Sequence, residues 1–280
     1  MATKKASSPA RKATAKKSTA AKSKSKTVSA AASRNKQVVL FGVKFNKSPF
    51  LGAILAEFVG TFLLIASILT VQGQPLFVAF AIIGIAMIIG GFSGAHFNPA
   101  LTVAAWVTRR INWVRAVGYI VAQAVGAAVA FLTLNAFLQN SATDATSLYA
   151  SSPTLFHAAT LPGGHEWYVL FAELLGTTIL GFGFAAALRS VRDKVVMGFT
   201  YGLSLLVALL VAGSVTALLL TTANTGLTFV NPAAALAANG LAWELWPILV
   251  YVIAPVVGAI IGFVIHDLIQ VETDSASDRR

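Results

Sequence analysis

Six stretches of this sequence are long and apolar enough to cross a lipid bilayer, which takes about 20 residues of helix. Hydrophobic residues make up 56% of the 280-residue chain, and charged residues make up only 11%. Inside a bilayer every backbone polar group needs a partner, and a helix supplies these partners within one segment. We therefore predict an all-α membrane protein with full spans near residues 50–72, 76–93, 114–138, 167–189, 196–219 and 246–269.

The positive charge is concentrated at the N-terminus. Residues 1–47 hold 13 Lys and Arg and no acid, in a chain of formal net charge +11. The first 35 residues are mainly Ala, Ser, Thr and Lys, which bury too little apolar surface to offset the entropy of ordering. We predict a basic disordered tail over 1–47, a membrane domain over 48–270 and a short polar C-terminal tail over 271–280.

The basic tail is interpreted as a cytoplasmic segment that contacts anionic lipid, at ~1 kcal/mol per basic residue near the surface. Contact with nucleic acid is an alternative. It would be made to phosphates and would be salt-sensitive, because the first 35 residues lack aromatic side chains for stacking. An organelle transit peptide also fits this composition, whereas a secretory signal peptide does not.

The basic residues of the membrane domain predict its orientation. They lie only within 109–115 and 189–194, and the stretches 139–166 and 220–230 hold none. With the tail inside, six spans place both basic groups on the cytoplasmic side, as the positive-inside rule requires. Both termini are therefore predicted to be cytoplasmic, in a plasma or inner membrane.

The sequence contains an internal repeat. Residues 56–61 read Ala-Glu-Phe-Val-Gly-Thr, and residues 172–177 read Ala-Glu-Leu-Leu-Gly-Thr. Each copy opens a set of three spans, with one Asn-Pro-Ala motif between the second and third. Because three is odd, the second set enters the membrane from the opposite side, so the repeats are inverted.

Each Asn-Pro-Ala motif predicts the start of a short helix, over 98–108 and 231–239. The Asn side chain accepts a bond from a free backbone N–H, and Pro suits the first helical position. Such a helix is roughly 15 Å long, about half of the hydrocarbon core. One motif alone would be an ordinary cap, but two in inverted repeats predict half-helices that meet at the midplane of a pore. The predicted pore residues are Asn98, Pro99, Ala100, Asn231, Pro232 and Ala233.

At the midplane, each helix N-terminus presents about +0.5 charge and free N–H groups. We expect the amide groups of Asn98 and Asn231 to donate to the oxygen of a passing water or hydroxyl. The hydrogens of that molecule then point away, which interrupts a proton wire, and the positive field opposes cations.

Two carboxylates, Glu57 and Glu173, lie inside apolar spans, where an ionisable group marks a site. A proton relay is one interpretation. We favour a structural brace, in which each carboxylate accepts donors from the loop preceding a half-helix, because irregular backbone at membrane depth needs partners. His96 is assigned to the same brace.

Several function classes find no support in the sequence. The chain has no cysteine, and its four histidines are scattered without metal-ligand spacing. It contains no phosphate-binding loop, nucleophile elbow or zinc-protease pattern. We expect no catalytic residues, no metal site, no cofactor and no enzyme activity.

Over residues 48–270 the sequence resembles the aquaporin and aquaglyceroporin (major intrinsic protein) family. The resemblance rests on the two Ala-Glu repeats, on 93–100 (Ser-Gly-Ala-His-Phe-Asn-Pro-Ala), on 119–127 and on the second Asn-Pro-Ala. It implies six spans, homotetramers in membrane lipid with one pore per subunit, and passive flow of water or small neutral solutes.

The sequence departs from the family pattern at the outer selectivity filter. The residue after the second Asn-Pro-Ala, almost always Arg in the family, is Ala234, and the Asp that follows it in glycerol channels is Ala235. The resemblance maps the other filter positions to span two, span five and the third residue before Asn231, with Leu205 as an alternative in span five. The predicted filter is Val78, Leu209, Thr228 and Ala234. By similarity such a filter is wider and more apolar than a water-only filter.

We interpret the chain as a passive channel for water and small uncharged solutes, with glycerol, urea, ammonia and metalloid hydroxides as candidates. One alternative is a structural or junctional membrane protein with a closed or vestigial pore. Another is an ion-leaky or sensing protein whose tail binds nucleic acid or lipid.

The interpretation of residues 1–35 as a segment outside the pore predicts that their deletion leaves permeability per reconstituted protein unchanged. Osmotic water flux into proteoliposomes measures this, with the full chain as the control. A change in flux at equal protein content would contradict it.

Overall fold

The computed structural model describes residues 37–40, 43–46, 49–139, 154–220 and 226–277. Within them, six helices are long and apolar enough to cross a membrane, which confirms the predicted all-α architecture. These segments begin and end within a few residues of the predicted spans. The first five spans are the single helices α1 Pro49–Thr70, α2 Pro75–Ser93, α4 Trp113–Gln139, α5 Glu166–Arg189 and α6 Lys194–Leu220.

The sixth span is interrupted near its start. It consists of a short α-helix, α8 Leu245–Ile248, a π-helical turn, η1 Leu249–Ile253, and the long helix α9 Ala254–Ser277. Pro255 is the second residue of α9, and a proline in a helix removes one N–H and clashes with the carbonyl four residues earlier. The wider π turn, closed by the Ala254 N–H on the Leu249 carbonyl, accommodates this proline.

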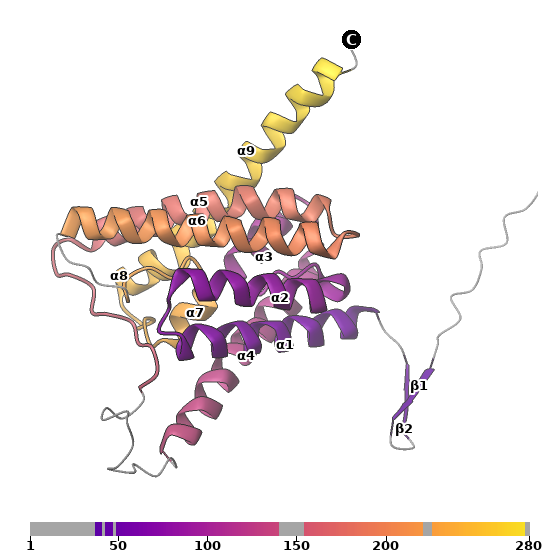
Figure 1. Cartoon of the computed structure of the whole chain (residues 1–280), viewed down its shortest axis with the longest axis horizontal. Helices are drawn as coiled ribbons and strands as arrows, with labels where there is room; N and C mark the ends of the chain where they lie inside the picture. The colour runs from indigo at the N-terminus through magenta and orange to yellow at the C-terminus, as the bar shows by residue number, and fades with distance from the viewer. Residues whose placement is uncertain (1–36, 41–42, 47–48, 140–153, 221–225, 278–280) are drawn as a thin grey trace, which may run out of the picture. The chain divides into compact units, whose positions relative to one another are not determined.

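Two short helices lie between the spans where the motifs predict them: α3 Pro99–Val107 and α7 Pro232–Ala237. Figure 1 shows both within the bundle, and they contact each other. In each repeat the first span packs on the other two. In the first repeat α1 packs on α2 and α4, and in the second repeat α5 packs on α6 and α9. The half-helices cross between repeats, since α3 packs on α9 and α7 packs on α4.

Glycines allow close approach where spans cross. A Cβ added at Gly126 of α4 would lie 2.6 Å from the carbonyl oxygen of Phe58 on α1. Gly258 and Gly262 of α9 meet backbone atoms of α5 in the same way, so this pair serves a crossing within the chain. Small residues at such crossings let helices pack in a membrane, where hydrophobic burial gives little driving force.

Two described regions differ from the predicted tails. Within 1–47, residues Gln37–Leu40 and Val43–Asn46 form an antiparallel pair of strands, β1 and β2, with Gln37 opposite Asn46. The rest of that predicted tail, apart from these strands, lies outside the described residues. At the other end, α9 runs to Ser277, so the predicted boundary at residue 270 falls inside a helix.

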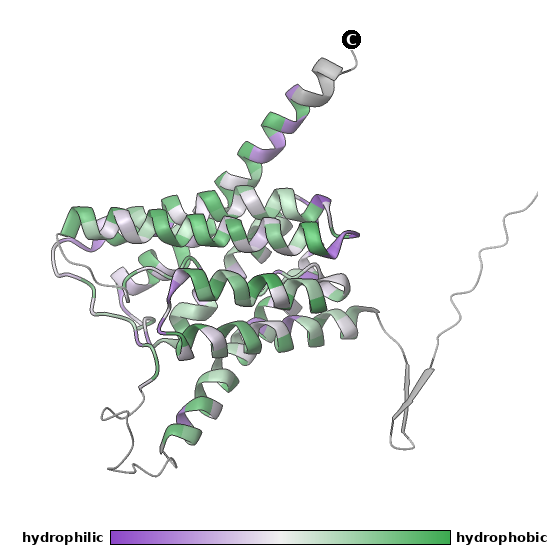
Figure 2. Cartoon of the chain, viewed as in Figure 1, coloured by the Kyte–Doolittle hydropathy of each residue, from purple (hydrophilic) through white to green (hydrophobic). Residues whose placement is uncertain are grey.

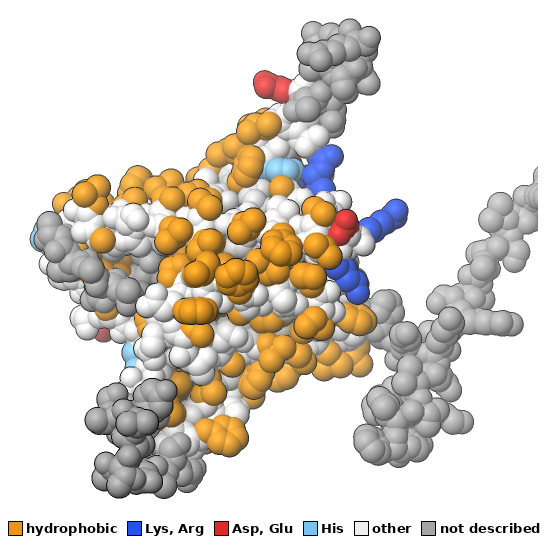
Figure 3. Space-filling model, in the orientation of Figure 1, with side chains coloured by type: hydrophobic (Ala, Val, Ile, Leu, Met, Phe, Trp, Pro, Cys, Tyr) orange, Lys and Arg blue, Asp and Glu red, His pale blue; other side chains and the backbone are white. Residues whose placement is uncertain are grey.

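The outer surface of the spans is apolar. Hydrophobic residues dominate the helices in Figure 2, and hydrophobic side chains cover much of the face of the helical body in Figure 3. Large exposed side chains include Phe80, Ile88 and Phe92 of α2 and Leu132 of α4. Such a surface suits contact with lipid tails or with further membrane helices.

The close crossing at Gly126 predicts that Gly126→Val lowers the free energy of unfolding by about 1–3 kcal/mol, because the added side chain forces α1 and α4 apart. Thermal unfolding in detergent measures the loss. Gly84→Val on α2 is the control, since a Cβ there meets nothing within 4 Å. Equal losses in both variants would contradict the prediction.

Candidate conduction site

The two asparagines cap their half-helices as their sequence context predicts. Asn98 Oδ1 accepts from the Ala100 N–H at 2.9 Å, and Asn231 Oδ1 accepts from the Ala233 N–H at 3.0 Å. Both asparagines have extended backbone with φ of −154°, as an N-cap residue requires. The side-chain amide of each is thereby turned so that its nitrogen faces away from its own helix.

The amide nitrogens link the two repeats. Asn98 Nδ2 donates to the carbonyl of Val230 at 2.9 Å, and Asn231 Nδ2 donates to the carbonyl of Phe97 at 3.1 Å. Each asparagine therefore bonds the residue that precedes the other. An amide group carries two N–H donors, so this link engages one donor of each asparagine.

The residues before the asparagines adopt left-handed backbone. Phe97 has φ of 47° and Val230 has φ of 49°. This region is strained for residues with a side chain, most of all for a β-branched one such as Val230, and persists only where surrounding structure enforces it. In this conformation the N–H groups of both residues point at a buried carboxylate.

Glu57 and Glu173 hold these turns from equivalent positions. Glu57 accepts from the N–H groups of His96 at 3.0 Å and Phe97 at 2.7 Å. Glu173 accepts from the N–H groups of Phe229 and Val230, the latter at 2.9 Å. Both carboxylates are fully buried. The turns that enter the half-helices thus have their donors satisfied inside the bundle.

Glu57 also accepts from a side chain, whereas the bonds of Glu173 to the described part of the chain come from backbone N–H groups. Gln123 of α4 donates to Glu57 Oε2 at 2.7 Å and to Thr102 Oγ1 at 2.9 Å. Thr102 Oγ1 lies 3.2 Å from His96 Nδ1, and Tyr201 donates to the His96 carbonyl at 2.9 Å. His96 is therefore held at its backbone and its ring.

A small cavity of about 30 Å³, hereafter the small cavity, lies beside the asparagines. Both candidate positions in span five, Leu209 and the alternative Leu205 one helical turn away, line this cavity. None of the described residues that line it is charged. Its lining includes both motif asparagines and all four predicted filter residues, Asn98, Asn231, Val78, Leu209, Thr228 and Ala234.

The small cavity differs from the predicted filter in two respects. Its volume holds roughly two or three waters, at about 10–15 Å³ for each, which is a small space beside the wide filter that the resemblance implies. Its lining also includes the aromatic side chains Phe156, Tyr201 and Phe229. Phe156 could not be identified from the sequence, because it lies in an irregular segment with no periodicity.

A second cavity of about 470 Å³, the arginine-lined cavity, is bordered by His96, Arg110, Arg115 and Arg189. Arg110 also donates to Asp267 at 2.6 Å. Arg115 thus borders a different cavity from Ala234 and adds no charge to the lining of the small cavity.

The contacts of Glu173 predict that Glu173→Gln lowers the free energy of unfolding by about 1–3 kcal/mol. A glutamine amide turns an N–H donor toward the turn at Val230, where both carboxylate oxygens now accept. Denaturation in detergent measures the loss. Glu244→Gln, at an exposed carboxylate, is the matched control, and a loss of similar size there would contradict the prediction.

Comparison with known proteins places this arrangement in a family. The profile described as "Major intrinsic protein" matches residues 44–266. A glycerol uptake facilitator protein-like 6 of Lactiplantibacillus plantarum is 33% identical, over 74% of this chain and 93% of that protein. Aquaporin NIP1-1 of Zea mays is 31% identical, over 79% of this chain and 76% of that protein.

The fold is similar to that of a solved structure, an aquaglyceroporin from Plasmodium falciparum. The TM-score is 0.57, the identity is 19%, and the match covers 78% of this chain and 96% of the other. At that identity the similarity concerns the fold alone. Because the family profile matches residues 44–266, most of this sequence, the chain belongs to the major intrinsic protein family and is a passive membrane channel rather than an enzyme.

Proposed function

We propose that this protein conducts water and small uncharged solutes passively, through the small cavity beside Asn98 and Asn231. The observation that carries this proposal is a cavity that contains both capped asparagines and has no charged residue in its described lining. The names of its relatives, which include an aquaporin and a glycerol uptake facilitator, agree with it.

The asparagines give the site its selectivity against ions. Each keeps one amide N–H beyond the bond to the opposite repeat, and the two helix N-termini add partial positive charge. A water that accepts from both amides turns its hydrogens outward and breaks a chain of hydrogen-bonded waters. Cations are opposed by the same field, so neutral molecules are the permeants.

The four predicted filter residues are proposed to form the outer constriction. Ala234 is 1% exposed and provides no donor, and Thr228 is the polar member of the set. A constriction without a cation discriminates by size and by how much hydration a solute loses, rather than by a fixed hydrogen-bond donor. This chemistry favours small neutral molecules with some apolar surface.

Glu57, Glu173 and His96 are proposed to act as structural braces rather than as a proton relay. Each carboxylate accepts hydrogen bonds from two backbone N–H groups, and Glu57 also accepts one from the side chain of Gln123. Groups engaged in this way stabilise the turn that they hold, and a proton on either one would remove an acceptor.

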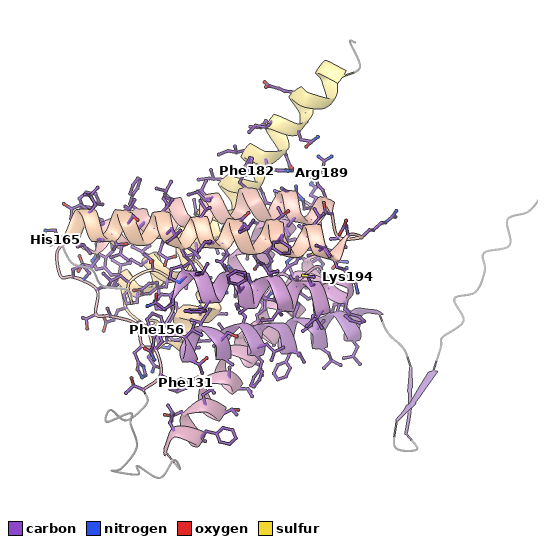
Figure 4. All side chains as sticks on the ribbon, in the orientation of Figure 1. Phe131, Phe156, His165, Phe182, Arg189 and Lys194 are labelled. Atoms are coloured by element: carbon purple, nitrogen blue, oxygen red, sulfur yellow. The ribbon has the colours of Figure 1, made fainter. Side chains whose placement is uncertain are left out.

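We also propose a homotetramer with cytoplasmic termini in a plasma or inner membrane. Arg189 and Lys194 lie at one end of the helical body and His165 lies at the other in Figure 4. Basic side chains gather at that first end in Figure 3, as expected for a cytoplasmic face. The apolar outer surface offers area for neighbouring subunits.

A closed or structural pore is the second candidate, favoured by the small volume of the cavity. Stopped-flow light scattering on proteoliposomes separates the two candidates by comparing osmotic water flux with glycerol uptake. Water flux above that of protein-free liposomes is expected. If neither water nor glycerol crosses faster than in protein-free liposomes, the closed or structural candidate is supported instead.

The small residue at position 234 predicts that Ala234→Arg narrows the outer constriction and reduces glycerol uptake roughly tenfold, an added barrier of about 1.4 kcal/mol, with a smaller loss of water flux. The same assay measures both. Ala234→Leu is the control for side-chain bulk without charge. Glycerol and water fluxes that fall by equal factors in Ala234→Arg would refute the filter assignment.

A further inference from the structure

We propose that Phe156, which lies outside both Asn-Pro-Ala repeats, is the specificity-determining side chain of the outer constriction and fills space that a long side chain at position 234 would occupy. This inference rests on the proposed channel function. It assigns solute selection to a segment between the repeats, where the predicted filter had no member.

The backbone around Phe156 is anchored on both sides. The Phe156 N–H donates to the carbonyl of Leu69 at the end of α1, at 3.0 Å. Gln72, in the turn before α2, donates its side-chain amide to the Thr154 carbonyl at 2.6 Å. Further along, the Ala158 N–H donates to the Ala238 carbonyl just after α7, at 2.7 Å. The segment therefore bonds to both repeats, and its Phe156 lines the small cavity.

The ring of Phe156 is directed inward. The side chain is only 6% exposed, and its ring packs on Phe229 with centroids 5.9 Å apart. It lines the small cavity together with Asn98 and Ala234. Figure 4 shows Phe156 toward the end of the helical body that carries His165, away from Arg189 and Lys194. That end is the outer one in the proposed orientation.

The turn before α2 is shaped to admit the ring. Gly73 has φ of 64°, and a Cβ there would lie 2.7 Å from the ring atom Cζ of Phe156. A glycine at this position serves both the left-handed backbone and the close approach of the ring. The aromatic ring therefore has a fitted place, although Phe156 belongs to no helix or strand.

The chemistry of the ring defines what it selects. A phenyl group excludes by size and offers no hydrogen-bond donor or acceptor of conventional strength. With Ala234 in the same lining, the small cavity selects neutral solutes by their cross-section. The size of the side chain at position 156, rather than a charge at position 234, is then the quantity that sets the ratio of solute flux to water flux.

The test is a size series at position 156 in proteoliposomes, read as the ratio of glycerol uptake to osmotic water flux. The ratio is expected to rise in the order Trp, Phe, Leu, Ala, with Phe156→Ala about tenfold above the unmodified chain. Leu155→Ala is the matched control. Leu155 is 8% exposed and lies in the same segment but does not line the small cavity, so its ratio is expected to stay unchanged.

A double variant tests the shared space. Phe156→Ala is expected to restore part of the glycerol uptake that Ala234→Arg removes, because the two side chains compete for one cavity. If Phe156 has a purely structural role, Phe156→Ala itself lowers glycerol uptake, and the double variant takes up less glycerol than Ala234→Arg alone. If Phe156→Ala does not fold, the Leu and Trp variants decide the order.

The outcomes separate the inference from the proposed function. If the unmodified chain conducts but the ratio is the same across the series, or changes equally in Leu155→Ala, the role of Phe156 is overturned and the channel function stands. If neither the unmodified chain nor any variant exceeds protein-free liposomes, both are overturned. If only the smaller side chains conduct, Phe156 closes the pore, and its control of the constriction is supported.

Discussion

The structure depends on keeping irregular backbone satisfied in an environment without water. The chain turns sharply before each half-helix, and Phe97 and Val230 take left-handed conformations there. Their N–H groups would be costly to leave unpaired at membrane depth. Glu57 and Glu173 supply the acceptors from the first span of each repeat, so two buried acidic side chains and two strained turns stabilise each other.

The two repeats form one site because each half-helix packs on a span of the other repeat. The helix α3 packs on α9 of the second repeat, and α7 packs on α4 of the first. Asn98 and Asn231 add reciprocal bonds to the carbonyls of Val230 and Phe97. Neither repeat alone contains a complete site. Glycines at the crossings between spans provide the close packing on which this geometry depends.

Three of the described arginines border one cavity and are absent from the lining of the other. The arginine-lined cavity carries Arg110, Arg115 and Arg189, whereas the described lining of the small cavity is uncharged. A charged group beside a narrow apolar passage would hold its own hydration or bind an opposite charge. The described lining of the small cavity therefore has helix N-termini and amide groups, rather than a cationic side chain, as its electropositive elements. The position of Arg115 also shows that it does not substitute for the arginine absent at position 234.

The sequence by itself determined the six spans, the inverted repeats and the capped half-helices, because these depend on local hydropathy, residue order and capping chemistry. The resemblance to the family, rather than residue patterns alone, singled out Val78, Leu209, Thr228 and Ala234, which line one cavity although they come from distant parts of the chain. Only the tertiary structure decided the π turn before Pro255 and the bonds between the asparagines and the opposite repeat. These depend on how distant segments pack.

Phe156 shows the limit most clearly. Its place in the small cavity follows from backbone bonds to Leu69 and from a turn at Gly73, neither of which leaves a periodic signal near residue 156. An irregular segment carries no pattern that states which of its side chains points inward. The aromatic part of the small cavity's lining was therefore decided by tertiary packing, whereas the capping chemistry of the half-helices could be predicted from the sequence.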